Sequence, residues 1–288
     1  MRMLHSLLFV TLVALAGTTV FGQTIDLGRG ALPLRVPSGY DADRPAPLIV
    51  MLHGYGSNGA RIESYLKLGE FVDSHVLFLV HPDGTEATGE RNPRFWNASK
   101  ACCNFGDQTV DDSAYLLSVI NAVKAAYEVD PKRVYLVGHS NGGFMSYRVA
   151  HDHSGTIAAI VSLAGAASTD DRPPPPNPVH VLQIHGTDDP TIKYDGDEIQ
   201  GSTYPGAVET VERWAEYNGC AAPGREAGTL DLDGEIPGME ASVTQYTKEC
   251  AAGGSSELWT IAGGDHSPSL SDSFSAKVVE WLLAHPKP

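Results

Sequence analysis

The sequence is poor in basic residues and has no long apolar run beyond its first 22 positions. Its 288 residues include 20 Lys and Arg against 35 Asp and Glu, a formal net charge of −15. This charge repels polyanions, so we expect no nucleic-acid partner and no membrane partner. No later segment approaches the roughly 20 apolar residues that cross a bilayer. The hydrophobic fraction, 42%, nevertheless excludes intrinsic disorder and predicts a substantial core.

Cysteine is also scarce, with four residues in the chain. They show no Cys-x-x-Cys spacing and no paired histidine nearby, so we expect no zinc or other metal site. Cys220 and Cys250 flank a Gly-rich segment that we expect to leave the core fold, and a disulfide between them would close a loop of about 30 residues. The adjacent Cys102 and Cys103 form a vicinal disulfide, pair elsewhere or stay reduced, and the sequence leaves this open.

The N-terminus has the pattern of a secretory signal peptide over residues 1–22. Arg2 is followed by an uncharged apolar stretch over 7–16, and small residues precede Gln23. We therefore expect export to the periplasm or the extracellular space, where disulfides persist. The rest of the chain, 23–288, is expected to form one domain.

Short apolar runs alternate with amphipathic segments along that domain. The runs are too continuously apolar for half-exposed strands and are typical of parallel strands buried on both faces. Strand and helix alternation predicts an α/β fold with a mostly parallel sheet and helices on both faces. The expected strands are 48–52, 76–80, 134–137, 158–163 and 179–184, and the expected helices are 60–72, 112–127, 141–151, 206–217 and 273–284.

The most informative motif lies between a strand and a helix. Gly138-His139-Ser140-Asn141-Gly142 is a G-x-S-x-G pattern in the context that a nucleophile elbow requires. The sharp turn strains the backbone at the central residue, and only glycine two positions away on either side lets the neighbouring backbone pass closely. We therefore interpret Ser140 as a catalytic nucleophile.

A serine nucleophile needs a histidine base and an acid that orients this histidine. In folds with such a nucleophile elbow the three residues occur along the chain in the order Ser, acid, His. Asp188 and Asp189 both follow the strand over 179–184, and we favour Asp189 because Pro190 biases it toward extended geometry. His266, after a strand and a Gly-Gly turn, is the expected base. Asp265 is adjacent to it and would point the wrong way to serve as the acid.

Two backbone N–H groups are expected to bind the oxyanion of a tetrahedral intermediate. One belongs to Asn141, the residue after the nucleophile. The other should come from the Gly-rich loop that follows the strand over 48–52, where Tyr55 is the natural donor. We expect His53 to brace this loop and not to act as a second base.

At these residues the chain resembles the secreted polyhydroxybutyrate depolymerase and feruloyl esterase (LpqC-like) family, close to carbohydrate esterase family 1. The resemblance implies an α/β-hydrolase fold, hydrolysis of carboxylic esters without a cofactor, and Asp189 as the acid. Family enzymes act on feruloyl or acetyl esters of plant polysaccharide, or on polyester. The matching segments are 52–58, 95–98 with 102–103, 110–112, 138–143, 185–190 with 194–196, 218–220 and 259–266.

We therefore expect a monomeric serine esterase whose partner is a polysaccharide-linked or polyester substrate. Trp96 and Trp259 lie in segments expected to overhang Ser140, so we predict that they contact substrate by aromatic stacking. A polyhydroxybutyrate-type depolymerase is the alternative substrate class. A serine peptidase is a rival, although such enzymes commonly carry a gating domain, and so is a non-catalytic binding protein on a hydrolase scaffold.

Overall fold

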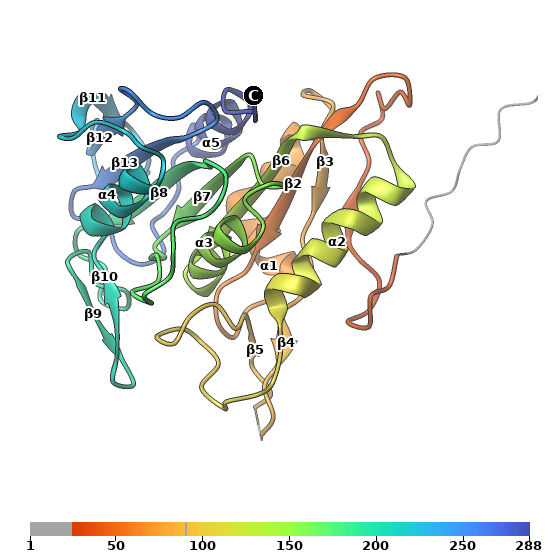
Figure 1. Ribbon diagram of the computed structural model, residues 1–288, viewed down its shortest axis with the longest axis horizontal. Coiled ribbons are helices and arrows are strands. Elements are labelled where there is room, and N and C mark those ends of the chain that lie inside the picture. Colours follow the sequence, from red (N-terminus) through yellow and green to blue (C-terminus); the bar gives the residue numbers. More distant parts are fainter. Residues whose placement is uncertain (1–24, 90) are drawn as a thin grey trace, which may run out of the picture.

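A nine-stranded sheet forms the centre of the computed structural model, which describes residues 25–89 and 91–288 (Figure 1). Six neighbouring strands in its middle run parallel, whereas the first strand in the order and the last two pair antiparallel, which confirms the expected mostly parallel sheet. The signal peptide expected over residues 1–22 lies outside the described residues. The strand order is β1 (Leu34–Arg35), β3 (Phe78–Val80), β2 (Ala46–Leu52), β6 (Val129–His139), β7 (Ala159–Leu163), β8 (His180–Gly186), β13 (Ser255–Ile261), β12 (Ala241–Tyr246) and β11 (Arg225–Leu230).

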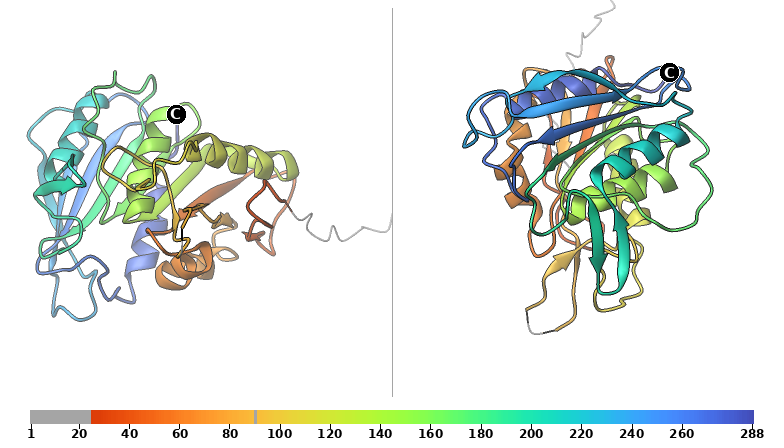
Figure 2. Two further views of the ribbon diagram at one scale, coloured as in Figure 1. Left: turned by 90° about the horizontal axis from the view of Figure 1, so that it is seen from below. Right: turned by 90° about the vertical axis from the view of Figure 1, so that its left-hand side faces the viewer.

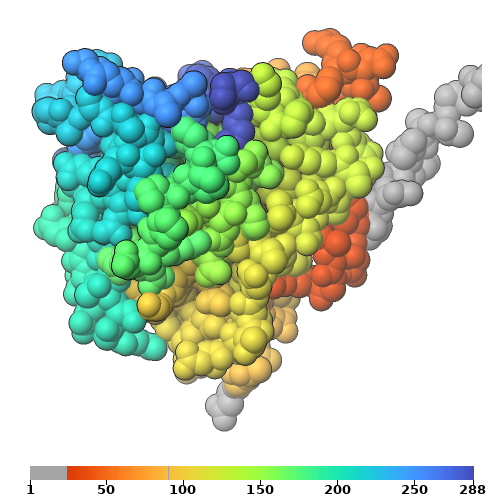
Figure 3. All heavy atoms as spheres, in the orientation of Figure 1, coloured from red at the N-terminus to blue at the C-terminus, as the bar shows by residue number. Residues whose placement is uncertain are grey.

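Helices cover both faces of the sheet, as the apolar strands require (Figure 2). One face carries α2 (Asp112–Ala126), α3 (Asn141–Asp152) and α4 (Ala207–Tyr217), and in Figure 3 atoms of these helices and of the loops between them cover this face. The other carries α1 (Gly59–Leu66) and α5 (Phe274–Leu283). Residues of β2 alternate between the two cores: Leu48 and Val50 pack on the α2 and α3 side, whereas Ile49 and Met51 pack on the α1 and α5 side.

Two segments differ from the expected elements. The helix expected over 60–72 is broken at Lys67, whose left-handed backbone (φ 51°) ends α1 before the 3-10 helix η1 (Leu68–Phe71). The segment 221–249 does not leave the fold as a loop, because β11 and β12 within it extend the sheet. The expected disulfide between Cys220 and Cys250 is confirmed and closes this addition at its base.

Two small hairpins project from the edge where the parallel strands end (Figure 2). One pairs β4 (Thr85–Glu86) with β5 (Arg94–Phe95), and the other pairs β9 (Gly196–Ile199) with β10 (Ser202–Pro205). The hairpins and the loops between them frame the carboxyl ends of β2, β6, β8 and β13, where ligands bind in open α/β sheets. In the described part of the chain, none of the helices combines the length and the apolar character needed to cross a membrane.

Candidate active site

Ser140 occupies a strained turn between β6 and α3. Its backbone has φ 54° and ψ −122°, outside the regions that L-residues usually adopt, and its N–H donates to the Leu163 carbonyl at 2.8 Å. A Cβ atom on Gly138 would overlap the backbone of Gly142, and one on Gly142 would overlap the Leu52 carbonyl. Both glycines are therefore required for the turn to pass between neighbouring backbones, as the G-x-S-x-G pattern predicts.

The structure brings Ser140, His266 and Asp189 into one chain of contacts. The His266 Nε2 atom lies 2.9 Å from Ser140 Oγ, and its Nδ1 atom lies 2.8 Å from Asp189 Oδ2. These three residues come from the ends of β6, β13 and β8. Asp188, the alternative acid, is exposed, and its Oδ1 accepts from Thr187 Oγ1 at 3.1 Å. Of the two candidates, Asp189 is the one in contact with His266.

Asp189 is buried and surrounded by donors. Its Oδ1 atom accepts from the N–H groups of Thr191 and Ile192, both at 2.8 Å, while His185 Nε2 lies 3.2 Å from Oδ2. Burial alone would raise the pKa of Asp189, but the contacts with His185 and His266 outweigh it and hold this pKa well below its usual range. Asp189 is therefore a carboxylate at neutral pH, able to orient a histidine through Nδ1–H.

A second histidine, His139, packs against His266 with ring centroids 5.0 Å apart. Its Nε2–H donates to the His266 carbonyl at 2.9 Å. Burial, reinforced by the neighbouring His266, lowers the pKa of His139 to about 4. His139 therefore stays neutral and holds the backbone of the loop that carries His266.

The N–H groups of Tyr55 and Asn141 have no hydrogen-bond partner among residues 25–89 and 91–288. His53 braces the loop before Tyr55: its Nδ1–H donates to the Gly54 carbonyl at 2.8 Å, and its Nε2 accepts from the Gly84 N–H at 2.9 Å. Burial lowers the pKa of His53, which keeps this bonding pattern in the neutral form. The backbone N–H groups of Tyr55 and Asn141 are therefore free to bind a ligand oxygen.

An open pocket of about 380 Å³ lies beside Ser140, within the range of small-molecule sites. Tyr55, Tyr65, Ile62 and His266 are among its lining residues. Tyr55 is 42% exposed and Phe105 is 40% exposed, and their rings pack with centroids 5.2 Å apart. An exposed pair of aromatic rings thus borders the pocket. The sequence marked Tyr55 for its backbone, but nothing in the sequence placed Phe105 against it.

The two tryptophans expected to contact substrate lie elsewhere. Trp96 is fully buried, and its indole N–H donates to the His53 carbonyl at 3.0 Å. Trp259 is 4% exposed, and its indole N–H donates to Glu257 at 2.6 Å. Neither side chain lines the pocket beside Ser140.

The second disulfide joins Cys102 and Cys103, so that both adjacent cysteines are oxidised. Cys102 Sγ accepts from the side-chain amide of Asn141 at 3.4 Å, next to the elbow. Across the described ranges, no cluster of three or more His, Cys, Asp or Glu side chains is arranged to hold a metal ion.

Comparison with known families places the chain among α/β-hydrolases. Residues 39–209 match the α/β-hydrolase family described as phospholipase/carboxylesterase. The chain belongs to this family. The matched region contains Tyr55, Ser140 and Asp189, and it ends before His266.

Curated relatives and solved structures fit the same family. The chain is 26% identical over 247 residues to feruloyl esterase B of Piromyces equi, covering 81% of this chain and 42% of that protein. It is 30% identical over 175 residues to poly(3-hydroxyalkanoate) depolymerase C of Paucimonas lemoignei, covering 56% of this chain and 39% of that one. It thus spans less than half the length of either relative. An acetyl xylan esterase from Aspergillus awamori, 14% identical, superposes with a TM-score of 0.62 over 88% of this chain and 93% of its own, which shows the shared α/β-hydrolase fold.

Proposed function

We propose that this protein is a serine carboxylic-ester hydrolase. The observation that carries the proposal is the unbroken set of contacts from Ser140 through His266 to Asp189, at 2.9 and 2.8 Å. It is the arrangement that activates a serine hydroxyl, because the imidazole can accept the proton while the carboxylate fixes its tautomer.

In the proposed mechanism Ser140 Oγ attacks the ester carbonyl, and its proton passes to His266 Nε2. The carbonyl oxygen becomes an anion held by the N–H groups of Tyr55 and Asn141. His266 then returns the proton to the leaving alcohol as the acyl-enzyme forms. Water, deprotonated by the same histidine, attacks the acyl-enzyme and releases the carboxylic acid and free Ser140.

We further propose feruloyl, cinnamoyl or acetyl esters of plant cell-wall polysaccharide as substrates, with a polyhydroxyalkanoate-type polyester as the alternative. The names of the relatives support both classes. The exposed rings of Tyr55 and Phe105 favour an ester that carries a ring, since aromatic pairs add about 0.5–1.5 kcal/mol beyond the buried area. The net charge of −15 is compatible with a neutral ester found by shape and not by long-range attraction.

The assignment is tested by Ser140→Ala, with Ser118→Ala on the exposed side of α2 as the matched control. Turnover of p-nitrophenyl acetate should fall by at least about 10⁴-fold in the first variant and stay unchanged in the second. Retained turnover in Ser140→Ala overturns the mechanism, whereas a wild-type protein without any turnover would support the competing class, a non-catalytic binding protein on a hydrolase scaffold.

The substrate class is tested on the wild-type protein by release of ferulate from methyl ferulate, acetate from acetylated xylan, and soluble acid from polyhydroxybutyrate. Phe105→Ala should lower kcat/KM for methyl ferulate about 3- to 10-fold relative to ethyl acetate, which has no ring. Met239→Ala, which removes another exposed apolar side chain, should leave that ratio unchanged. Equal effects of Phe105→Ala on both esters would exclude selective recognition of the substrate ring by the aromatic pair.

We also propose that residues 1–22 direct export and that residues 23–288 act as one monomeric catalytic domain. The two disulfides support an oxidising compartment. Mass spectrometry of the exported protein should give a chain that begins at Gln23 and contains no free thiol. An exported chain that retains residues 1–22 or reduced cysteines would contradict the assignment.

A further inference from the structure

Trp96 connects the two segments that carry the proposed oxyanion donors. Its indole N–H donates to the His53 carbonyl at 3.0 Å, two residues before Tyr55. Its backbone N–H donates to Asn141 Oδ1 at 2.7 Å, and its carbonyl accepts from Asn141 Nδ2 at 2.9 Å. A single buried residue is therefore bonded to both sides of the site, through its side chain to one and through its backbone to the other.

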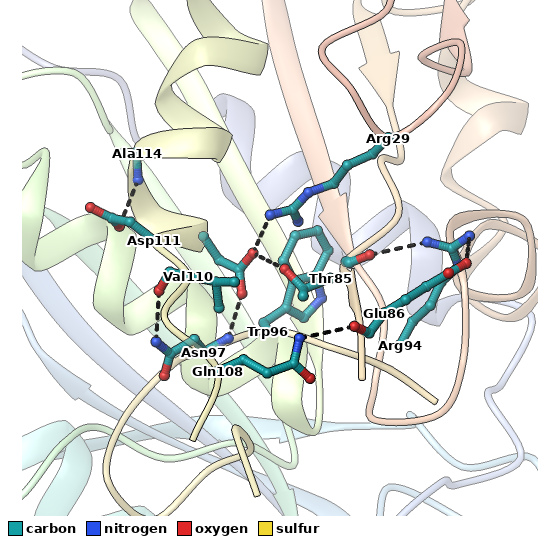
Figure 4. A network of polar contacts seen from close by, with 12 residues as sticks. Arg29, Thr85, Glu86, Arg94, Trp96, Asn97, Gln108, Val110, Asp111 and Ala114 are labelled. Carbon is teal, nitrogen blue, oxygen red and sulfur yellow. Dashed lines mark hydrogen bonds and ion pairs between the residues drawn. The ribbon is translucent and has the colours of Figure 1, made fainter. Parts of the chain in front are cut away.

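The backbone on the far side of Trp96 is held just as firmly (Figure 4). The N–H of Asn97 donates to the fully buried carboxylate of Asp112 at 2.6 Å, and the Asn97 side chain donates to the Val110 carbonyl at 2.9 Å. Asp112 also accepts from Arg29, at 2.6 Å, and from Thr85. These contacts fix the loop after β5 to the start of α2, so that Trp96 cannot swing outward to serve as a mobile clamp.

The Tyr55 and Asn141 N–H groups lie beyond the point where β2 and β6 are hydrogen-bonded to each other. The ladder between β2 and β6 ends at the pair Leu52 and Gly138, and beyond it the chains diverge into the loop of Tyr55 and the elbow of Asn141. Past that pair, the hydrogen bonds that link the two segments within residues 25–89 and 91–288 run through β5 and the loop that follows it. They are the bonds of Trp96 and a bond from the Gly56 N–H to the Arg94 carbonyl at 2.8 Å.

We propose that Trp96 is a positioning residue that sets the separation and direction of the Tyr55 and Asn141 N–H groups. The inference rests on the function proposed above, in which these groups bind the oxyanion. An oxyanion hole stabilises the transition state only when its donors lie about 2.7–3.1 Å from the anionic oxygen. A shift of the His53 to Tyr55 backbone therefore weakens transition-state binding while leaving ground-state binding of the ester intact.

Trp96→Phe tests the proposal, because it removes the indole N–H and keeps an aromatic ring in the core. Loss of this buried hydrogen bond should misplace the Tyr55 N–H and lower kcat about 5- to 30-fold, with KM unchanged. The drop should stay below the 10²–10³-fold that follows outright removal of an oxyanion donor. The inhibition constant of an arylboronic acid, which forms a tetrahedral anion on Ser140, should rise by the same factor as kcat falls.

Trp281→Phe is the matched control. Trp281 is also buried, its indole N–H donates to Glu257 at 3.2 Å, and it lies on α5 in the core of the opposite face. This variant should lower Tm without changing kcat or boronate inhibition. An equal loss of kcat in both variants, an unchanged kcat in Trp96→Phe, or a raised KM at constant kcat would each overturn the positioning role.

Asn141→Ala tests the same link through the Asn141 side chain. It also provides a test if Trp96→Phe does not fold. It removes both bonds to the Trp96 backbone but keeps the Asn141 N–H, and we again expect kcat to fall with KM unchanged. Where both variants fold, the double variant should lose less activity than the product of the single losses, because the two changes release one connection. Independent, multiplicative losses contradict the proposal, whereas failure of the proposed function appears separately as turnover retained in Ser140→Ala.

Discussion

Replacing Asp189 by Asn should abolish catalysis while leaving the fold intact, because the surroundings dictate how the new amide is oriented. Two N–H groups, from Thr191 and Ile192, point at Oδ1 at 2.8 Å each. If the NH2 of the new amide faced these two N–H groups, both would be buried without an acceptor, at a cost of about 1–3 kcal/mol for each N–H. The amide carbonyl therefore faces them, with a preference of about 2–6 kcal/mol over the flipped orientation. The NH2 end therefore faces His266.

This orientation forces His266 into the wrong tautomer. With an N–H donor opposite it, His266 Nδ1 must give up its proton, and Nε2–H then donates toward Ser140 Oγ when it should accept. The serine has no base, and we expect kcat for p-nitrophenyl acetate to fall about 10⁴-fold, the scale known for this substitution in a serine protease triad. Because Asn matches Asp in shape, Tm should change by only a few degrees.

Asp188→Asn is the matched control for this prediction. Asp188 is the neighbouring residue, it is exposed, and it contacts Thr187 and not His266. Its kcat should stay within about twofold of the wild-type value, as for other surface changes. The reasoning is refuted if Asp189→Asn keeps more than about a tenth of the wild-type kcat, or if Asp188→Asn loses as much as Asp189→Asn.

Two further predictions concern stability. Burial lowers the pKa of His180 to about 4, below the value near 6.5 in the unfolded chain. The unfolded state therefore binds a proton at higher pH than the folded state, and the free energy of unfolding decreases as the pH falls from about 6.5 toward 4. Urea unfolding should show that the free energy of unfolding drops less between pH 7 and pH 4.5 in His180→Gln than in the wild-type protein, by up to about 2–3 kcal/mol. Equal drops in the two proteins would refute this. Gly142→Ala forces a Cβ into the Leu52 carbonyl and should lower the free energy of unfolding by at least about 3 kcal/mol. Gly106→Ala, whose Cβ would meet only Gln108 Oε1 at an ordinary contact distance of 3.8 Å, should be neutral by the same measurement.

The sequence was most informative where a local pattern determines local structure. The apolar run before Gly138 and the glycines around Ser140 predict a strand, a turn and a helix without reference to the rest of the chain, and the structure has all three. The position of His266 after a strand and a Gly-Gly turn is local information of the same kind. Its contact with Ser140 follows because the carboxyl ends of parallel strands meet at one edge of the sheet.

Contacts between distant segments were not predictable in this way. The polar residues after Trp96 suggested a loop over the pocket, but Trp96 is fully buried, and its backbone N–H donates to the side chain of Asn141, which lies 45 positions away. The antiparallel strands β11 and β12 are rich in polar residues, and β11 has no buried side chain, so their sequence pattern resembles a loop. They become part of the sheet because β12 pairs with β13 and β11 pairs with β12. In each case the determining partner lies outside the window in which a sequence pattern can be recognised.

The most direct measurement of the central claim is the site of covalent labelling by a fluorophosphonate. The reagent reacts with a serine only when a neighbouring base activates it, so it reports the Ser140 and His266 contact itself. We predict one equivalent of adduct, located by mass spectrometry on the peptide that contains Ser140, and no adduct in Ser140→Ala. Absence of labelling in the wild-type protein, or an adduct on a different residue that persists in Ser140→Ala, would contradict the account.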